Sequence, residues 1–144
     1  MKKFEFSLDS IQKLREQNLS LEQLKYAEAA RAVVDQKKVI EEMRAKFADE
    51  NAKFKSESGD TNTTQLNLMR QYLIYLQNRI EQEIVVLSRL ELKEAEARES
   101  MINARVESKS LDVLYEQQYD QYVEESQKKE RDNIEEMLSA RYFR

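Results

Sequence analysis

The stretch Ser56-Glu57-Ser58-Gly59-Asp60-Thr61-Asn62-Thr63-Thr64 decides the fold, because it is the only strong break in the helical pattern of the chain. It holds the single Gly of 144 residues, and the chain has no Pro. Gly59 can take the positive φ of a helix C-cap, and residues 60–64 offer N-caps for a second helix. With one reversal of direction available, sheets, barrels and multi-helix globules are excluded, whereas long helices need neither Gly nor Pro.

The half of the chain that follows this break carries a seven-residue repeat of apolar side chains. Steps of three and four from Leu66 reach 17 positions, and 13 of them are apolar, Ala or Tyr. We call these the seam positions of the second half. They are Leu66, Met69, Leu73, Leu76, Ile80, Glu83, Leu87, Leu90, Glu94, Ala97, Met101, Ala104, Ser108, Leu111, Tyr115, Gln118 and Tyr122. A repeat of this period predicts a helix that supercoils left-handedly against a partner helix.

The half before the break has a weaker seam with the same period. Its apolar members recur every seven residues and are Leu19, Tyr26, Val33, Ile40, Phe47 and Phe54. The apolar residues nearer the N-terminus, Leu8, Ile11, Leu14 and Leu21, fall on a shifted stripe. We therefore expect a change of phase near residues 14–21.

Two seams joined by one short turn predict an all-α fold, an antiparallel two-helix coiled-coil hairpin. We expect one domain over 1–144, with a first helix at about 7–55, a turn at about 56–63 and a longer second helix at about 64–142. Residues beyond about 114 then have no partner within the chain. The alternative is one long helix that dimerises in parallel, but the polar break would interrupt its seam.

The composition excludes several classes of function. The chain has no Cys and no His, so it lacks thiol nucleophiles, the commonest general base and the commonest metal ligands. One Gly is too few for a phosphate-binding loop. We therefore expect no enzyme, no catalytic residue, no metal and no cofactor. The net charge of −4 gives no general attraction to nucleic acid.

The lengths of the apolar runs indicate whether the chain could span a membrane. The longest, Leu73–Leu76 and Ile84–Leu87, are far too short to span a membrane. Glu5 and Asp9 interrupt any signal-peptide core near the N-terminus. The sequence predicts a cytoplasmic protein without membrane insertion.

Two acidic residues, Glu83 and Glu94, occupy seam positions. They weaken the seam, and they either set the register of the two helices or meet a basic partner. We favour the first interpretation.

Two groups near the C-terminus are candidate partner-binding surfaces. Tyr115, Tyr119 and Tyr122 share one helical face, which suits either core packing or a protein interface. After a polar stretch, an amphipathic face returns. Its residues include Ile134, Met137, Leu138 and Tyr142. Docking to a partner is favoured over self-association or fraying.

Several elements together resemble the FliJ family, the small coiled-coil components of the flagellar type III export apparatus. The chain opens with Phe4-Glu5-Phe6-Ser7-Leu8 and continues into Leu14-Arg15-Glu16, followed by the single Gly turn. The second helix carries the stretch Gln71–Gln82, and the chain closes on Arg141–Arg144. The resemblance covers nearly the whole chain.

The resemblance implies a fold and a function. Members of this family are antiparallel coiled coils similar to the γ stalk of rotary ATPases. They insert into the centre of the export ATPase hexamer, promote its assembly and ATP hydrolysis, and contact the export gate protein FlhA and export chaperones. The implied location is the cytoplasm, peripheral to the inner-membrane export apparatus.

The resemblance also implies roles for particular residues. The gate-facing segment corresponds to Tyr72, Leu76, Arg79 and Glu83, of which Arg79 and Glu83 depart from the family pattern. By analogy with the stalk, the end that bears both termini enters the ring. The residues expected to bind the ATPase are Phe4, Phe6, Ile134, Met137, Leu138 and Tyr142.

The alternative function is a structural or chaperone-like coiled coil that serves as an oligomeric scaffold or holds client proteins. The face of Tyr115, Tyr119 and Tyr122 is its best support.

Overall fold

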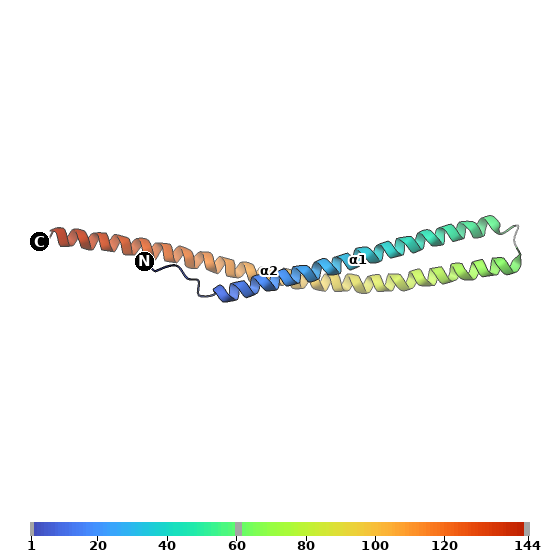
Figure 1. Ribbon diagram of the computed structural model, residues 1–144, viewed down its shortest axis with the longest axis horizontal. Helices are drawn as coiled ribbons and strands as arrows, with labels where there is room; N and C mark the ends of the chain where they lie inside the picture. Colours follow the sequence, from blue (N-terminus) through green and yellow to red (C-terminus); the bar gives the residue numbers. More distant parts are fainter. Residues whose placement is uncertain (1, 60–61, 143–144) are drawn as a thin grey trace. The chain divides into compact units, whose positions relative to one another are not determined.

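The computed structural model describes residues 2–59 and 62–142. Over these residues the chain forms two helices, α1 (Asp9–Glu57) and α2 (Thr63–Tyr142), joined by a short connection (Figure 1). With 80 residues against 49, α2 is the longer helix. The predicted all-α hairpin with a longer second helix is confirmed. Both helices begin and end within two residues of the positions expected from the sequence.

A backbone hydrogen bond and an acidic side chain stabilise the start of α1. The carbonyl of Leu8 accepts the first helical hydrogen bond, from the amide of Gln12 at 2.8 Å. Asp9 stands in the first turn, where a negative charge favours the helix dipole, and forms an ion pair with Lys13 at 3.2 Å.

The connection between the helices is capped by side chains. The hydroxyls of Ser56 and Ser58 each donate to a carbonyl three residues earlier, at 3.0 Å. Asn62 is the N-cap of α2, since its side-chain oxygen accepts the amide of Thr64 at 3.3 Å and its carbonyl accepts the amide of Leu66 at 3.0 Å. Residues 60 and 61, also offered as caps, lie outside the described residues.

The prediction that Gly59 adopts a positive φ as the C-cap of α1 is wrong. The glycine does not adopt a positive φ, and a Cβ built on it meets no atom within 4 Å. The serine hydroxyls satisfy carbonyls of the last turn instead, so neither the conformation nor the space at this position requires glycine.

The chain divides into two compact units, and we describe each by itself. Unit 2, Gln23–Ser100, contains the turn and the parts of both helices next to it. Its core is the predicted seam, where α1 contributes Val33 and Ile40 and α2 contributes Leu73 and Leu76, all at most 9% exposed. These residues come from the positions that the seven-residue period selects.

Unit 1 combines Met1–Glu22 with Met101–Arg144. Phe6, Ala104, Ser108 and Leu111 form its buried core. Residues 2–6 are not helical, and their aromatic side chains contact Tyr115, Tyr119 and Tyr122. The expectation that α2 has no partner beyond residue 114 is therefore wrong, because the extended N-terminal segment covers it as far as Tyr122.

The expected change of phase near residues 14–21 is also wrong. Of the residues assigned to the shifted stripe, Ile11, Leu14 and Leu21 are exposed, whereas Leu8 is half-buried and lies on the seam itself. The seam instead runs back from Leu19 through Arg15, Gln12 and Leu8 in unbroken steps of three and four, all of them half-buried. Polar side chains can hold these positions because α2 offers them polar partners, as described below.

Neither helix, over the residues that the structure describes, has an apolar stretch long enough to cross a membrane.

The seam makes a matched pair of substitutions informative. Val33 is 5% exposed and its neighbour Val34 is 51% exposed. Val33→Ala should lower the free energy of unfolding by about 1.5–2.5 kcal/mol, since it removes two buried methyl groups. Val34→Ala should change it by less than about 0.5 kcal/mol. Urea unfolding followed by helical circular dichroism measures both, and equal losses would contradict the assigned seam.

Candidate functional site: an aromatic cluster, a polar layer and an uncovered helix end

An aromatic cluster forms where the N-terminal segment of unit 1 contacts α2. The ring of Phe4 lies 5.5 Å from that of Tyr115 and 5.3 Å from those of Tyr119 and Tyr122, measured between centroids. Two of these contacts are edge-to-face, the arrangement that aromatic quadrupoles favour, with about 0.5–1.5 kcal/mol per pair beyond area burial. The Tyr residues share one face because they are spaced by four and three along α2.

Two further contacts hold the N-terminal segment in place. Phe6 packs edge-on against Tyr115 at 5.3 Å and is buried. The hydroxyl of Tyr122 donates to the backbone carbonyl of Lys2 at 2.6 Å. Phe4 and Phe6, expected to bind an ATPase, are thus engaged within the chain. Tyr115 and Tyr119 keep part of their rings exposed, so this face is both core and surface.

Polar pairs join α1 to α2 next to the aromatic cluster. Gln12 donates to the carboxylate of Asp112 at 2.9 Å, and Arg15 forms an ion pair with Glu107 at 2.7 Å. Both side chains of the ion pair are more than two-fifths exposed, so it contributes no more than about 1 kcal/mol. Sequence reasoning missed these residues. Continuing the steps of the first seam back from Leu19 reaches both Arg15 and Gln12.

The last turns of α2 carry an uncovered apolar strip, which we call the C-terminal strip. Its side chains are exposed, from 48% for Leu138 to 84% for Tyr142. The strip consists of Ile134, Met137, Leu138 and Tyr142. Continuing the seam beyond Tyr122, as far as the structure describes the chain, reaches polar residues, which are Glu125, Lys129, Asp132, Glu136 and Ser139. The strip therefore faces away from the seam, and an extension of α1 would not cover it.

The expected gate-facing residues divide between the seam and its edge in unit 2. Leu76 is 4% exposed and packs in the seam. Tyr72 is half-buried, stacks on Tyr75 at 6.3 Å, and has the ammonium of Lys46 5.9 Å from its ring centroid. The side-chain hydrogen bond with Tyr72 raises the pKa of Lys46, and the contact links Tyr72 on α2 to Lys46 on α1.

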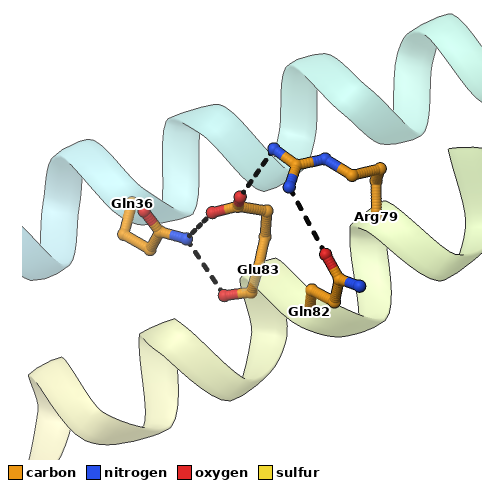
Figure 2. Close-up of polar contacts among 4 residues, drawn as sticks. All are labelled: Gln36, Arg79, Gln82 and Glu83. Carbon is orange, nitrogen blue, oxygen red and sulfur yellow. Dashed lines mark hydrogen bonds and ion pairs between the residues drawn. The ribbon is translucent and has the colours of Figure 1, made fainter.

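Glu83 and Arg79 belong to a polar layer that crosses the seam (Figure 2). The side-chain amide of Gln36 on α1 donates to the Glu83 carboxylate at 2.6 Å and to the Glu83 carbonyl at 3.0 Å. Arg79 donates to the other carboxylate oxygen at 3.2 Å and to Gln82 at 3.3 Å. Glu83 is thus paired across the two helices, which favours the register interpretation.

Glu94, the second acidic seam residue, is half-buried. No hydrogen bond or ion pair engages its carboxylate within residues 2–59 and 62–142, so the polar layer at Glu83 has no counterpart there.

The described part of the chain contains no group of three or more Asp or Glu residues arranged to hold a metal ion.

No protein-family model, curated protein or solved structure matches this chain.

The pairing of Gln36 with Glu83 predicts that substitutions of these two residues have non-additive effects on the free energy of unfolding. Gln36→Leu should lower the free energy of unfolding by about 1–3 kcal/mol, because it leaves the half-buried Glu83 carboxylate without its donor from α1. Adding Glu83→Leu should restore most of that loss, since both polar groups are then replaced by packed apolar ones. Chemical unfolding of Gln36→Leu, Glu83→Leu and the double variant measures the difference. A double variant as unstable as the sum of both single losses would show that the pairing contributes nothing.

Proposed function

We propose that this chain is a stalk or adaptor of the flagellar type III export apparatus, similar to the FliJ family. In this proposal the C-terminal end of α2 binds in the centre of the export ATPase ring and promotes ring assembly and ATP hydrolysis. The chain also links the ring to the export gate protein FlhA and to export chaperones, on the cytoplasmic side of the inner membrane.

The observation that carries the proposal is the C-terminal strip. Four large side chains on one helical face are about half exposed or more, beyond the point where the seam has ended. An exposed apolar stripe on a helix is the pattern that docks in a groove of another protein. Met137, which is 72% exposed, adds a flexible side chain that adapts to an irregular pocket.

The other candidate residues take different parts in the proposal. Phe4 and Phe6 act on the ATPase indirectly, because they brace α2 through Tyr115, Tyr119 and Tyr122. At the gate-facing segment, Tyr72 and Arg79 are partly exposed, whereas Leu76 and Glu83 hold the segment to α1 through the seam.

The ATPase assay is the direct test. Adding the purified chain to a flagellar export ATPase should raise the rate of ATP hydrolysis. Met137→Asp should raise the concentration needed for half-maximal activation by about tenfold or more, because docking would bury an unpaired charge. Ser139→Asp is the matched control, since it adds the same charge two residues away at a polar, exposed position.

The alternative function, a scaffold or client-binding coiled coil, predicts that the chain does not activate the ATPase. It is favoured by the exposed atoms of Tyr119 in the aromatic cluster. Under that function the chain leaves ATP turnover and hexamer assembly unchanged. A pull-down with the ATPase would then recover the full chain and a chain that ends at Asn133 equally.

A further inference from the structure

The outer face of α2 in unit 2 carries a second apolar strip, which we call the outer strip. Val85 and Leu92 are seven residues apart and more than half exposed, and the exposed Ala95 follows three residues later. The strip repeats with the same period as the seam but lies on the side of α2 turned away from it. A face with this period fits another helix.

Four charged residues border the outer strip in two pairs. Arg89 and Glu96 lie on one flank, seven residues apart, and Glu91 and Arg98 lie on the other, also seven apart. All four are exposed, and none forms a hydrogen bond or ion pair within the described residues. Each flank therefore offers one positive and one negative charge to an incoming helix.

We propose that the outer strip binds a second copy of this chain, with the two α2 helices antiparallel. In such a pair, core positions at equal distance on either side of the symmetry axis face each other. With the axis between residues 93 and 94, Leu92 of one copy packs on Ala95 of the other. Twofold symmetry repeats each contact. The proposal does not rest on the proposed function, because it involves neither the C-terminal strip nor the ATPase.

The flanking charges fit this arrangement. In an antiparallel pair each flank meets the same flank of the other copy. Glu91 then lies opposite Arg98 of the second copy, and Arg89 lies opposite Glu96. Symmetry doubles these to four ion pairs, and flanking charges of this kind select partner and orientation in coiled coils.

Displaced registers are disfavoured by the same four residues. Sliding one helix by seven residues in one direction places Glu91 against Glu91 and Arg89 against Arg89. Sliding it the other way places Arg98 against Arg98 and Glu96 against Glu96. Like charges that face each other destabilise a pair, so a single antiparallel register is selected.

A parallel pair is disfavoured as well. In a parallel pair one flank meets the opposite flank of the other helix, five residues further on. That brings Glu91 of each copy against Glu96 of the other and leaves Arg89 and Arg98 without an acidic partner among the four. The charge pattern thus favours the antiparallel second copy.

Sedimentation equilibrium of the full chain tests the proposal. The wild-type chain should show a concentration-dependent monomer–dimer equilibrium. Glu91→Arg and Arg98→Glu should each weaken association by about tenfold, because each puts two like-charged pairs in place of two attractive ones. Arg31→Glu, an exposed charge reversal on α1, is the matched control and should leave association unchanged.

Mixing the two single variants provides a control for folding. In a mixed dimer the arginine introduced at position 91 of one chain meets the glutamate introduced at position 98 of the other. The unchanged Arg98 of the first chain meets the unchanged Glu91 of the second, so wild-type association should return. A wild-type chain that stays monomeric to about 1 mM overturns the proposal. A mixture that remains as weak as the single variants overturns it too, as does equal association of all variants, which would place the contact elsewhere.

A spin label measures the orientation. The chain has no Cys, so Gln82→Cys gives one labelling site on an exposed position. The symmetry axis passes between residues 93 and 94, which places the two labels about 23 residues apart along the pair, roughly 30–35 Å. A distance of roughly 10–20 Å would mean that the helices are parallel and would overturn the proposal.

Discussion

The seam between α1 and α2 is the interaction on which the rest of the structure depends. A helix pair has no second layer, so the free energy that opposes chain entropy comes mainly from one line of side chains. In unit 2 this line is most deeply buried at Val33, Ile40, Leu73 and Leu76. The faces of the two helices that are turned away from the seam stay exposed and are available to partners.

Polar residues within the seam give it a defined register. A purely apolar seam tolerates sliding by one heptad, because each apolar layer resembles the next. Gln36 and Glu83 prevent this, since displacement would separate a half-buried carboxylate from its donor. In unit 1, Gln12 and Arg15 pair with Asp112 and Glu107 in the same way, although these contacts are more exposed. The polar residues of the seam thus fix the register of the two helices, whereas its apolar residues provide most of the stability.

Much of this structure follows from the sequence alone. The seven-residue period placed the core, and the break at residues 56–64 placed the reversal, because both are local signals. The phase of the first seam near Gln12 and Arg15 was missed, because apolarity was taken as the mark of a core position. The return of Phe4 onto Tyr115, Tyr119 and Tyr122 was missed too, since a contact between residues about 110 apart leaves no periodic trace. Which partner covers an exposed face depends on the partner's residues as well.

The central claim is that α1 and α2 pair side by side within one molecule. Spin labels at Glu41→Cys and Glu81→Cys test it most directly, since both positions are exposed, lie on opposite helices of unit 2, and occur in a chain without native Cys. The protein is diluted with unlabelled chain so that only intramolecular distances are observed. Helix axes about 8–10 Å apart predict a label separation of roughly 15–30 Å. A separation near 60 Å, the length of about 40 residues of continuous helix, would contradict the pairing of α1 and α2 within one molecule.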